Sequence, residues 1–120
     1  MDIIETDSRL LRQYKGVTRF TLRTHITSSG NSPFNKWFSK LDGTQKNQVR
    51  TRLDRVQNGQ MGHSKSVRQN MEAILFNSGM RIYFTRESPN VIILLCGGNK
   101  ASQDRDINQA LKFIGERYGK

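Results

Sequence analysis

The chain has 120 residues, enough for one modest hydrophobic core, so a single domain over residues 1–120 is expected. Twenty Lys and Arg stand against ten Asp and Glu, giving a net charge of +10 that makes a polyanion the natural partner. No apolar run approaches the roughly 18 residues of a membrane-spanning helix, no secretion signal is recognisable, and one cysteine suits a reducing compartment. We therefore expect a cytoplasmic protein with no membrane segment.

The N-terminal part of the chain is the hardest to interpret. Residues 1–18 show no clear pattern, and the sequence leaves open what this extension does. From Arg19 to Ile26, apolar residues alternate with polar ones, which predicts a half-buried strand. The polar segment 28–33, which contains glycine and proline, then interrupts the chain.

Two helices are predicted next. Ser32 is a suitable N-cap, Pro33 suits the first helical position, and the apolar residues that follow have helical spacing up to Asp42-Gly43: Phe34, Trp37, Phe38 and Leu41. Residues 44–58 have a second apolar stripe, with basic residues on the other faces. The two segments predict a helical hairpin.

The second half of the chain is rich in short apolar segments. Residues 73–76, 80–86 and 91–96 are separated by turn sequences and predict an antiparallel meander. The last segment has helical spacing from Ile107 to Tyr118 and predicts a helix packed back on the sheet.

Several kinds of chemistry are disfavoured by the residues present. His25 and His63 are far apart in sequence and form no metal motif, and Cys96 lies in an apolar strand where a reactive thiolate is not expected. The glycines at 97 and 98 lack the spacing of a nucleotide-binding loop.

The basic residues offer a better candidate site. Arg81 and Tyr83 alternate with apolar residues and should share one sheet face. Lys100 follows the next strand, and Lys65 lies in a loop that leads into the sheet. Together these side chains could bind a phosphodiester and stabilise the charge that develops during its cleavage, unless Arg81 and Lys100 only solubilise the surface.

Other cations and aromatics have two interpretations. Arg50, Arg52 and Arg55 more simply solvate a helix than form an RNA track. Trp37 and Phe38 fit the core better than an exposed base-stacking surface. Tyr83 either stacks on a base, moves a proton, or is an ordinary strand tyrosine.

Five motifs follow one another along residues 20–118. They are Phe34-x-x-Trp37-Phe38-x-x-Leu41, the basic helix after it, Gly59-x-x-Gly62-x-x-Lys65-x-Val67, Gly79-Met80-Arg81-Ile82-Tyr83-Phe84, and Leu94-Leu95-Cys96-Gly97-Gly98-Asn99-Lys100-x-x-Gln103-x-x-Asp106-Ile107-x-x-Ala110. In this order and spacing they resemble the RelE/ParE toxin superfamily, and within it the HigB-like addiction module killer proteins. The resemblance implies an α+β fold with an N-terminal helical hairpin packed on a twisted antiparallel β-sheet and a C-terminal helix.

The resemblance also implies a function. The chain would be the toxin of a type II toxin–antitoxin system, a ribosome-dependent mRNA endonuclease that inhibits translation without a metal or other cofactor. Arg81, Lys100 and Lys65 would be its catalytic residues, and its RNA contacts would be Arg68, Tyr83, Arg86 and Arg50. Its partners would be the ribosome, mRNA and a helix-turn-helix antitoxin that brings the complex to operator DNA.

One motif departs from the family pattern. The usual Glu-Leu-Arg triplet on the strand before Arg81 reads Met71-Glu72-Ala73, so one basic residue is missing. The toxin is then attenuated, uses Arg68 or Arg86 instead, or no longer cleaves RNA. A ParE-like inhibitor of DNA gyrase and a non-catalytic homologue that binds an antitoxin are the alternative functions.

Overall fold

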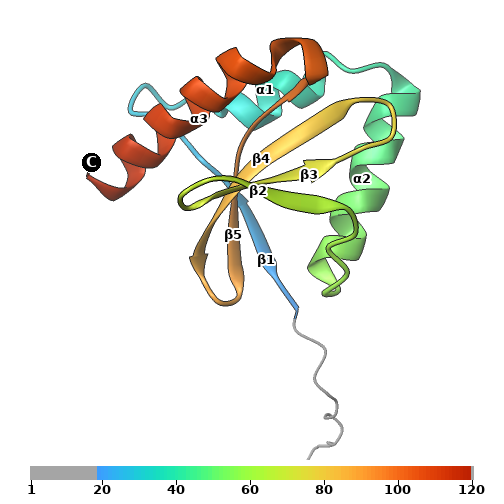
Figure 1. Ribbon diagram of the computed structural model, residues 1–120, viewed down its shortest axis with the longest axis horizontal. Coiled ribbons are helices and arrows are strands. Elements are labelled where there is room, and N and C mark those ends of the chain that lie inside the picture. The colour runs from blue at the N-terminus through green and yellow to red at the C-terminus, as the bar shows by residue number, and fades with distance from the viewer. Residues whose placement is uncertain (1–18, 120) are drawn as a thin grey trace, which may run out of the picture.

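The computed structural model describes residues 19–119, and the predicted extension over residues 1–18 lies outside them (Figure 1). The elements in chain order are β1 (Thr21–Thr24), α1 (Pro33–Ser39), α2 (Gly43–Gln57), β2 (Ser64–Arg68), β3 (Met71–Leu75), β4 (Met80–Ser88), β5 (Val91–Asn99), the 3-10 turn η1 (Lys100–Ser102) and α3 (Gln103–Tyr118).

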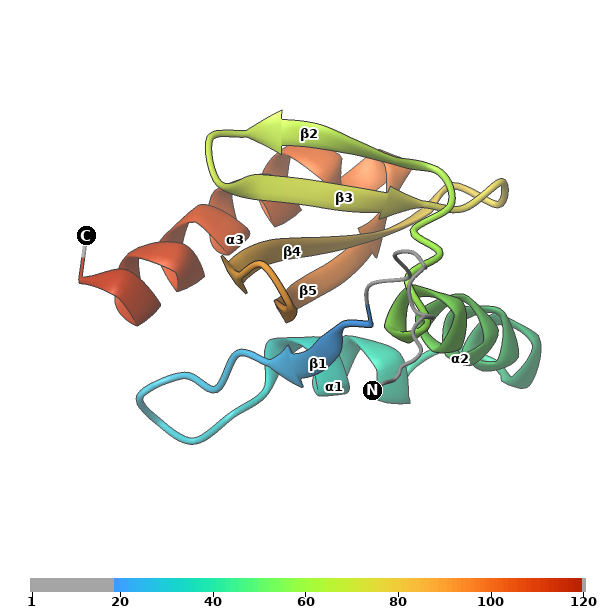
Figure 2. The ribbon, with the colours of Figure 1, turned by 90° about the horizontal axis from the view of Figure 1, so that it is seen from below.

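The strands form one mixed sheet in the order β1-β5-β4-β3-β2 (Figure 2). The strands from β2 to β5 pair antiparallel with their neighbours, as the predicted meander requires for β3 to β5. β1 pairs parallel with β5, and its register places Thr21 opposite Val91. The predicted antiparallel sheet is therefore wrong, because its edge strand comes from the start of the described chain and runs parallel to its neighbour.

The predicted N-terminal helical hairpin is also wrong. The described chain begins with β1, and α1 and α2 follow it in the middle of the sequence. The predicted N-cap at Ser32, followed by Pro33, is confirmed, but α1 ends at Ser39, and Asp42, which was predicted at the end of that helix, instead forms a capping box at the start of α2. The difference lies in the order of the elements, because β1 precedes both helices, while the apolar residues of both helices join a core cluster with the sheet.

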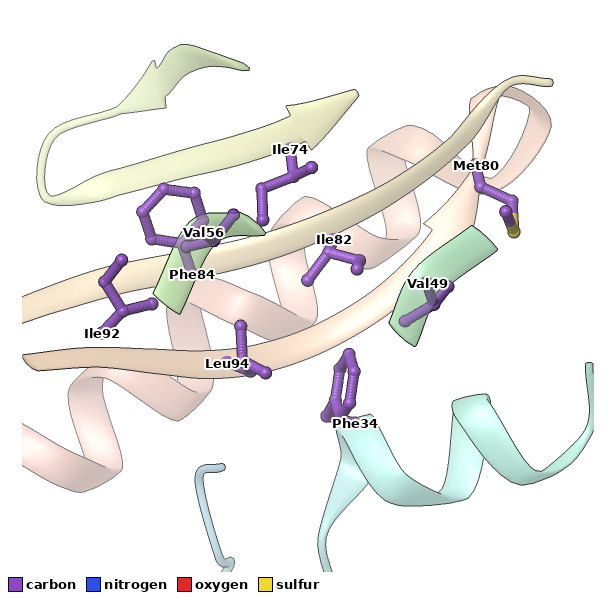
Figure 3. Close-up of a cluster of buried hydrophobic side chains, with 9 residues drawn as sticks. All are labelled: Phe34, Val49, Val56, Ile74, Met80, Ile82, Phe84, Ile92 and Leu94. Atoms are coloured by element: carbon purple, nitrogen blue, oxygen red, sulfur yellow. The ribbon is translucent and has the colours of Figure 1, made fainter. Parts of the chain in front are cut away.

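The first core lies between the sheet and the helices α1 and α2. Ile82 and Phe84 of β4 face this side together with Ile92 and Leu94 of β5 (Figure 3). Helix residues cover them, and the buried ones are Phe34, Val49 and Val56. Phe38 packs against the edge of the cluster and the ring of Trp37 rests on β5, where a Cβ at Gly97 would lie 2.3 Å from that ring. Both aromatics thus contribute to the core, as predicted.

The second core lies on the opposite face, under α3. Tyr83, Ile93 and Leu95 point to this side, and Ile107 and Ala110 of α3 pack on them. The predicted final helix on the sheet is confirmed. Cys96 is buried in the same cluster, and burial raises the pKa of its thiol to about 12, so the thiol is protonated and unreactive at neutral pH.

Candidate functional site

β4 places Arg81 and Tyr83 on the sheet face that α3 partly covers. Ile82 and Phe84 belong to the core on the α1 and α2 side, whereas Tyr83 belongs to the core under α3. Arg81, two residues before Tyr83, shares its face because side chains alternate along a strand. The predicted common face of Arg81 and Tyr83 is confirmed.

Both residues carry a polar atom without a partner. Within residues 19–119, Nε of Arg81 and the hydroxyl of Tyr83 are buried and make no hydrogen bond. Burial raises the pKa of Tyr83, and although the charge of Arg81 opposes that effect, Asp106 adds to it. The Tyr83 hydroxyl therefore stays protonated at neutral pH, and both atoms are donors for which the described chain provides no acceptor.

Tyr83 is also completely buried. A ring with no exposed surface cannot stack on a base, so the interpretation of Tyr83 as a stacking platform is wrong. Its remaining role is that of a protonated neighbour of Arg81.

Lys65 lies on the same sheet face. The sheet register aligns Lys65 of β2 with Ala73 of β3, then Tyr83 of β4, then Cys96 of β5. Directly opposed residues share a face, so Lys65 is an exposed cation at the end of the row that contains Tyr83. Lys65 was predicted in a loop, and this is wrong because the polar segment 64–68 pairs with β3 as a strand.

Lys100 reaches this region from the end of β5. Arg81 pairs with Gly98, and Lys100 begins the 3-10 turn two residues later. A Cβ built on Gly79 would lie 4.0 Å from Cβ of Lys100, so Lys100 borders the turn that leads into Arg81. We call the residues Lys65, Arg81 and Lys100 the basic face.

The backbone that carries Lys100 is fixed by a buried carboxylate. Asn99 and Ser102 cap the 3-10 turn reciprocally, and the Ser102 hydroxyl donates to the carboxylate of Asp106, which is only 4% exposed. Gly98 makes this approach possible, because a Cβ there would lie 1.8 Å from Oδ2 of Asp106. The two glycines therefore allow close packing on both faces of β5, against Trp37 at Gly97 and against Asp106 at Gly98.

Two predicted RNA contacts lie away from the basic face. Arg86 donates to Glu72 at 2.6 and 3.1 Å and covers Phe84 on the α1 and α2 side. Arg50 projects from α2, with its guanidinium carbon 5.2 Å from the centre of the Phe38 ring. The structure does not bring these two residues to Arg81.

The position of the missing arginine lies in the row of Lys65. Ala73 stands between Lys65 and Tyr83 on the face under α3. Arg86 cannot replace the absent cation, because its side chain is on the opposite face and pairs with Glu72. Arg68 is exposed at the end of β2 and stays the remaining candidate substitute, although its partner Met71 and the partner of Arg81, Leu75, lie at opposite ends of β3.

One cation has a role that the sequence did not indicate. Arg52 donates to three backbone carbonyls, those of Met61, His63 and Leu75, and so ties α2 to the ends of β2 and β3. Burial lowers the pKa of its guanidinium, with Arg55 adding to the effect. Arg52 thus neither solvates α2 nor forms part of an RNA track, and helical spacing alone could not distinguish it from Arg50.

A buried histidine was also missed. His25 is 3% exposed, and its Nε2 lies 3.0 Å from Oε1 of Glu116. This contact connects the segment after β1 to the end of α3.

Within the described range 19–119, no group of three His, Cys, Asp or Glu side chains is placed to hold a metal ion. Over the same range, no helix is both long and apolar enough to cross a membrane.

Comparison with known proteins finds a relative that aligns with most of this chain. An uncharacterized protein of Haemophilus influenzae is 36% identical to this chain over 89 residues, which cover 72% of this chain and 89% of that protein. No protein-family model matches the chain.

Proposed function

Since the chain belongs to the same family as this uncharacterized Haemophilus influenzae protein, we propose its function from its own residues: a RelE/ParE-like toxin of the HigB-like branch that cleaves mRNA on the ribosome. One observation carries the proposal. Arg81 is half-buried on the sheet face that also holds the exposed Lys65, and the exposed Lys100 borders the turn that leads into Arg81. Donors placed in this way suit the oxygens of a phosphodiester.

The proposed reaction needs no group beyond RNA, water and side chains. The RNA 2′-oxygen attacks the adjacent phosphorus and loses its proton to water, and the bond from phosphorus to the 5′-oxygen breaks, leaving a 2′,3′-cyclic phosphate. Arg81 and Lys100 stabilise the negative charge that grows on the phosphoryl oxygens. The leaving 5′-oxygen takes a proton from a lysine of the basic face; Lys65 is the candidate, because it is exposed and Lys100 is assigned to the phosphoryl oxygens.

The partners follow from the charge and the resemblance. A net charge of +10 favours insertion into a site lined by ribosomal RNA, because neutralised phosphates supply most of the sequence-independent affinity. The proposal includes a cytoplasmic location and a helix-turn-helix antitoxin that neutralises the toxin and holds it at operator DNA.

The proposal is tested by induced expression in a bacterial host with primer extension on abundant transcripts. Cuts within translated codons that disappear when translation is blocked are expected. Arg81→Ala and Lys100→Ala should each reduce cleavage at least tenfold, or about 1.4 kcal/mol of transition-state stabilisation. Lys112→Ala removes an exposed cation outside the basic face and should cleave like the parent chain. Cleavage that survives the double change of Arg81 and Lys100 would refute the assignment.

A second candidate is inhibition of DNA gyrase by binding. Ala73 favours it, because a site that lacks one of its usual cations is weakened for catalysis while its surface remains available to a protein. Growth arrest without RNA cuts, unaffected by Arg81→Ala, would select this function.

A further inference from the structure

The described chain also has a cavity outside the basic face, and its lining contains neither Lys65, Arg81 nor Lys100. This cavity of about 910 Å³ lies between α2, the loop that precedes β2, and the end of β3 with the turn after it. This volume is within the range of about 300 to 1,000 Å³ that is typical of small-ligand sites. The cavity is therefore large enough for a nucleotide.

The charge of the lining favours an anion. Arg52, Arg55 and His63 line the cavity, and none of the lining residues is acidic. Arg52 already donates hydrogen bonds to three backbone carbonyls, so it forms part of the cavity wall. Arg55 is exposed, and within residues 19–119 no carboxylate lies within 4.0 Å of its guanidinium. Arg55 is thus the cation available to a phosphate.

The rest of the lining suits a nucleobase. The half-buried ring of Phe76 contributes apolar surface, and it is held in place by Arg52, whose guanidinium carbon lies 5.2 Å from the ring centre. Asn47 and Asn77 supply amides that both donate and accept, which matches the mixed edge of a base. Phosphate and base therefore both find partners of the right chemistry.

The cavity and the basic face meet at one turn. Asn77 and Ser78 line the cavity, and the next residue, Gly79, borders Lys100. A single RNA strand that crosses this turn would contact both sites. We propose that the cavity is a second nucleotide subsite, which holds a nucleotide of the strand whose phosphodiester lies at Arg81 and Lys100. This inference rests on the proposed function, because that function supplies the strand.

The test measures binding of fluorescent 2′-O-methyl RNA, which cannot be cleaved, to the full chain. A dinucleotide reports the basic face, and a pentanucleotide can reach both sites. Arg55→Glu should weaken pentanucleotide binding at least tenfold, reduce the salt dependence by about one phosphate contact, and change dinucleotide binding less than twofold. Lys46→Glu is the matched control, because it makes the same charge change on the same helix at a residue that does not line the cavity.

The outcomes separate the subsite from the proposed function. If Arg81→Ala weakens both RNAs and Arg55→Glu behaves like Lys46→Glu, the subsite is refuted and the toxin function stands. If the pentanucleotide depends on Arg55 and not on Arg81, the subsite stands and the catalytic assignment fails. If AMP alone binds with the same dependence on Arg55, the ligand is a free nucleotide. Stronger Arg55-dependent binding of a polyglutamate peptide than of RNA would assign the cavity to an acidic protein and overturn the inference.

Discussion

Gly98→Ala is the substitution whose effect follows most directly from the coordinates. The new Cβ would lie 1.8 Å from Oδ2 of Asp106, 2.7 Å from its Cγ and 2.8 Å from Oγ of Ser102. Ordinary contacts need about 3.4 Å or more, so the buried carboxylate must move and release the Ser102 hydroxyl. Overpacking costs about 1 to 3 kcal/mol, and losing a hydrogen bond to a charged group costs about 1.5 to 3 kcal/mol. We expect a loss of about 3 to 5 kcal/mol.

Urea unfolding followed by circular dichroism measures this loss. For a domain of this size it also corresponds to a melting temperature lower by at least about 10 °C. Gly43→Ala is the control, because a Cβ at Gly43 meets nothing within 4 Å, and it should change stability by less than about 1 kcal/mol. In an Asp106→Ala background, Gly98→Ala should cost much less. Equal stabilities of Gly98→Ala and Gly43→Ala would show that the contact between β5 and α3 is wrong.

The other predictions concern one cation and two titrating groups. Arg52→Lys should destabilise the chain by about 2 to 3 kcal/mol in urea unfolding, because an ammonium group cannot span three carbonyls, whereas Arg50→Lys should have little effect. The Cys96 thiol has an ordinary pKa of 9.0 and a native pKa of about 12, so native stability should fall as pH rises above about 9, and Cys96→Ala should reduce this fall. Hydrogen bonds from Arg117 and Tyr118 hold the pKa of Glu87 below its ordinary value of 4.5. Their stabilising effect is therefore present above pH 4.5 and disappears as the carboxylate is protonated in acid. In thermal melts, Glu87→Gln should reduce this loss of stability at low pH.

Local patterns predicted most of the elements and the meander from β3 to β5, but not the pairing of β1 or the presence of β2. The cap at Ser32 and the apolar spacing identified both middle helices, because these signals depend on neighbouring residues. The parallel pairing of β1 with β5 joins residues about 70 positions apart, and no local pattern records it. Strand β2 was missed because an edge strand with exposed polar residues lacks apolar alternation.

The candidate site was predicted in part. Alternation along β4 correctly placed Arg81 beside Tyr83, but it could not show that α3 buries the tyrosine completely. Alternation along β4 also could not show that Glu72 holds Arg86 on the opposite face, because Glu72 belongs to a different strand, β3. The loop before β2 decides which arginine of α2 reaches backbone carbonyls. The sequence alone therefore could not distinguish the role of Arg52 from that of the neighbouring arginines.

The parallel docking of β1 also sets an order of folding. Phe20 donates to the carbonyl of Gln57, and His25 donates to the carbonyl of Leu94. During synthesis from the N-terminus, residues 21–24 must therefore wait, without their partner strand, until residues 91–94 have left the ribosome. A strand of only four residues, with Thr21 and Arg23 exposed, is a poor template for pairing with the strands of other chains during that interval. The last strand to join the sheet is thus one of the first to be made, and its brevity and polarity protect it from aggregation.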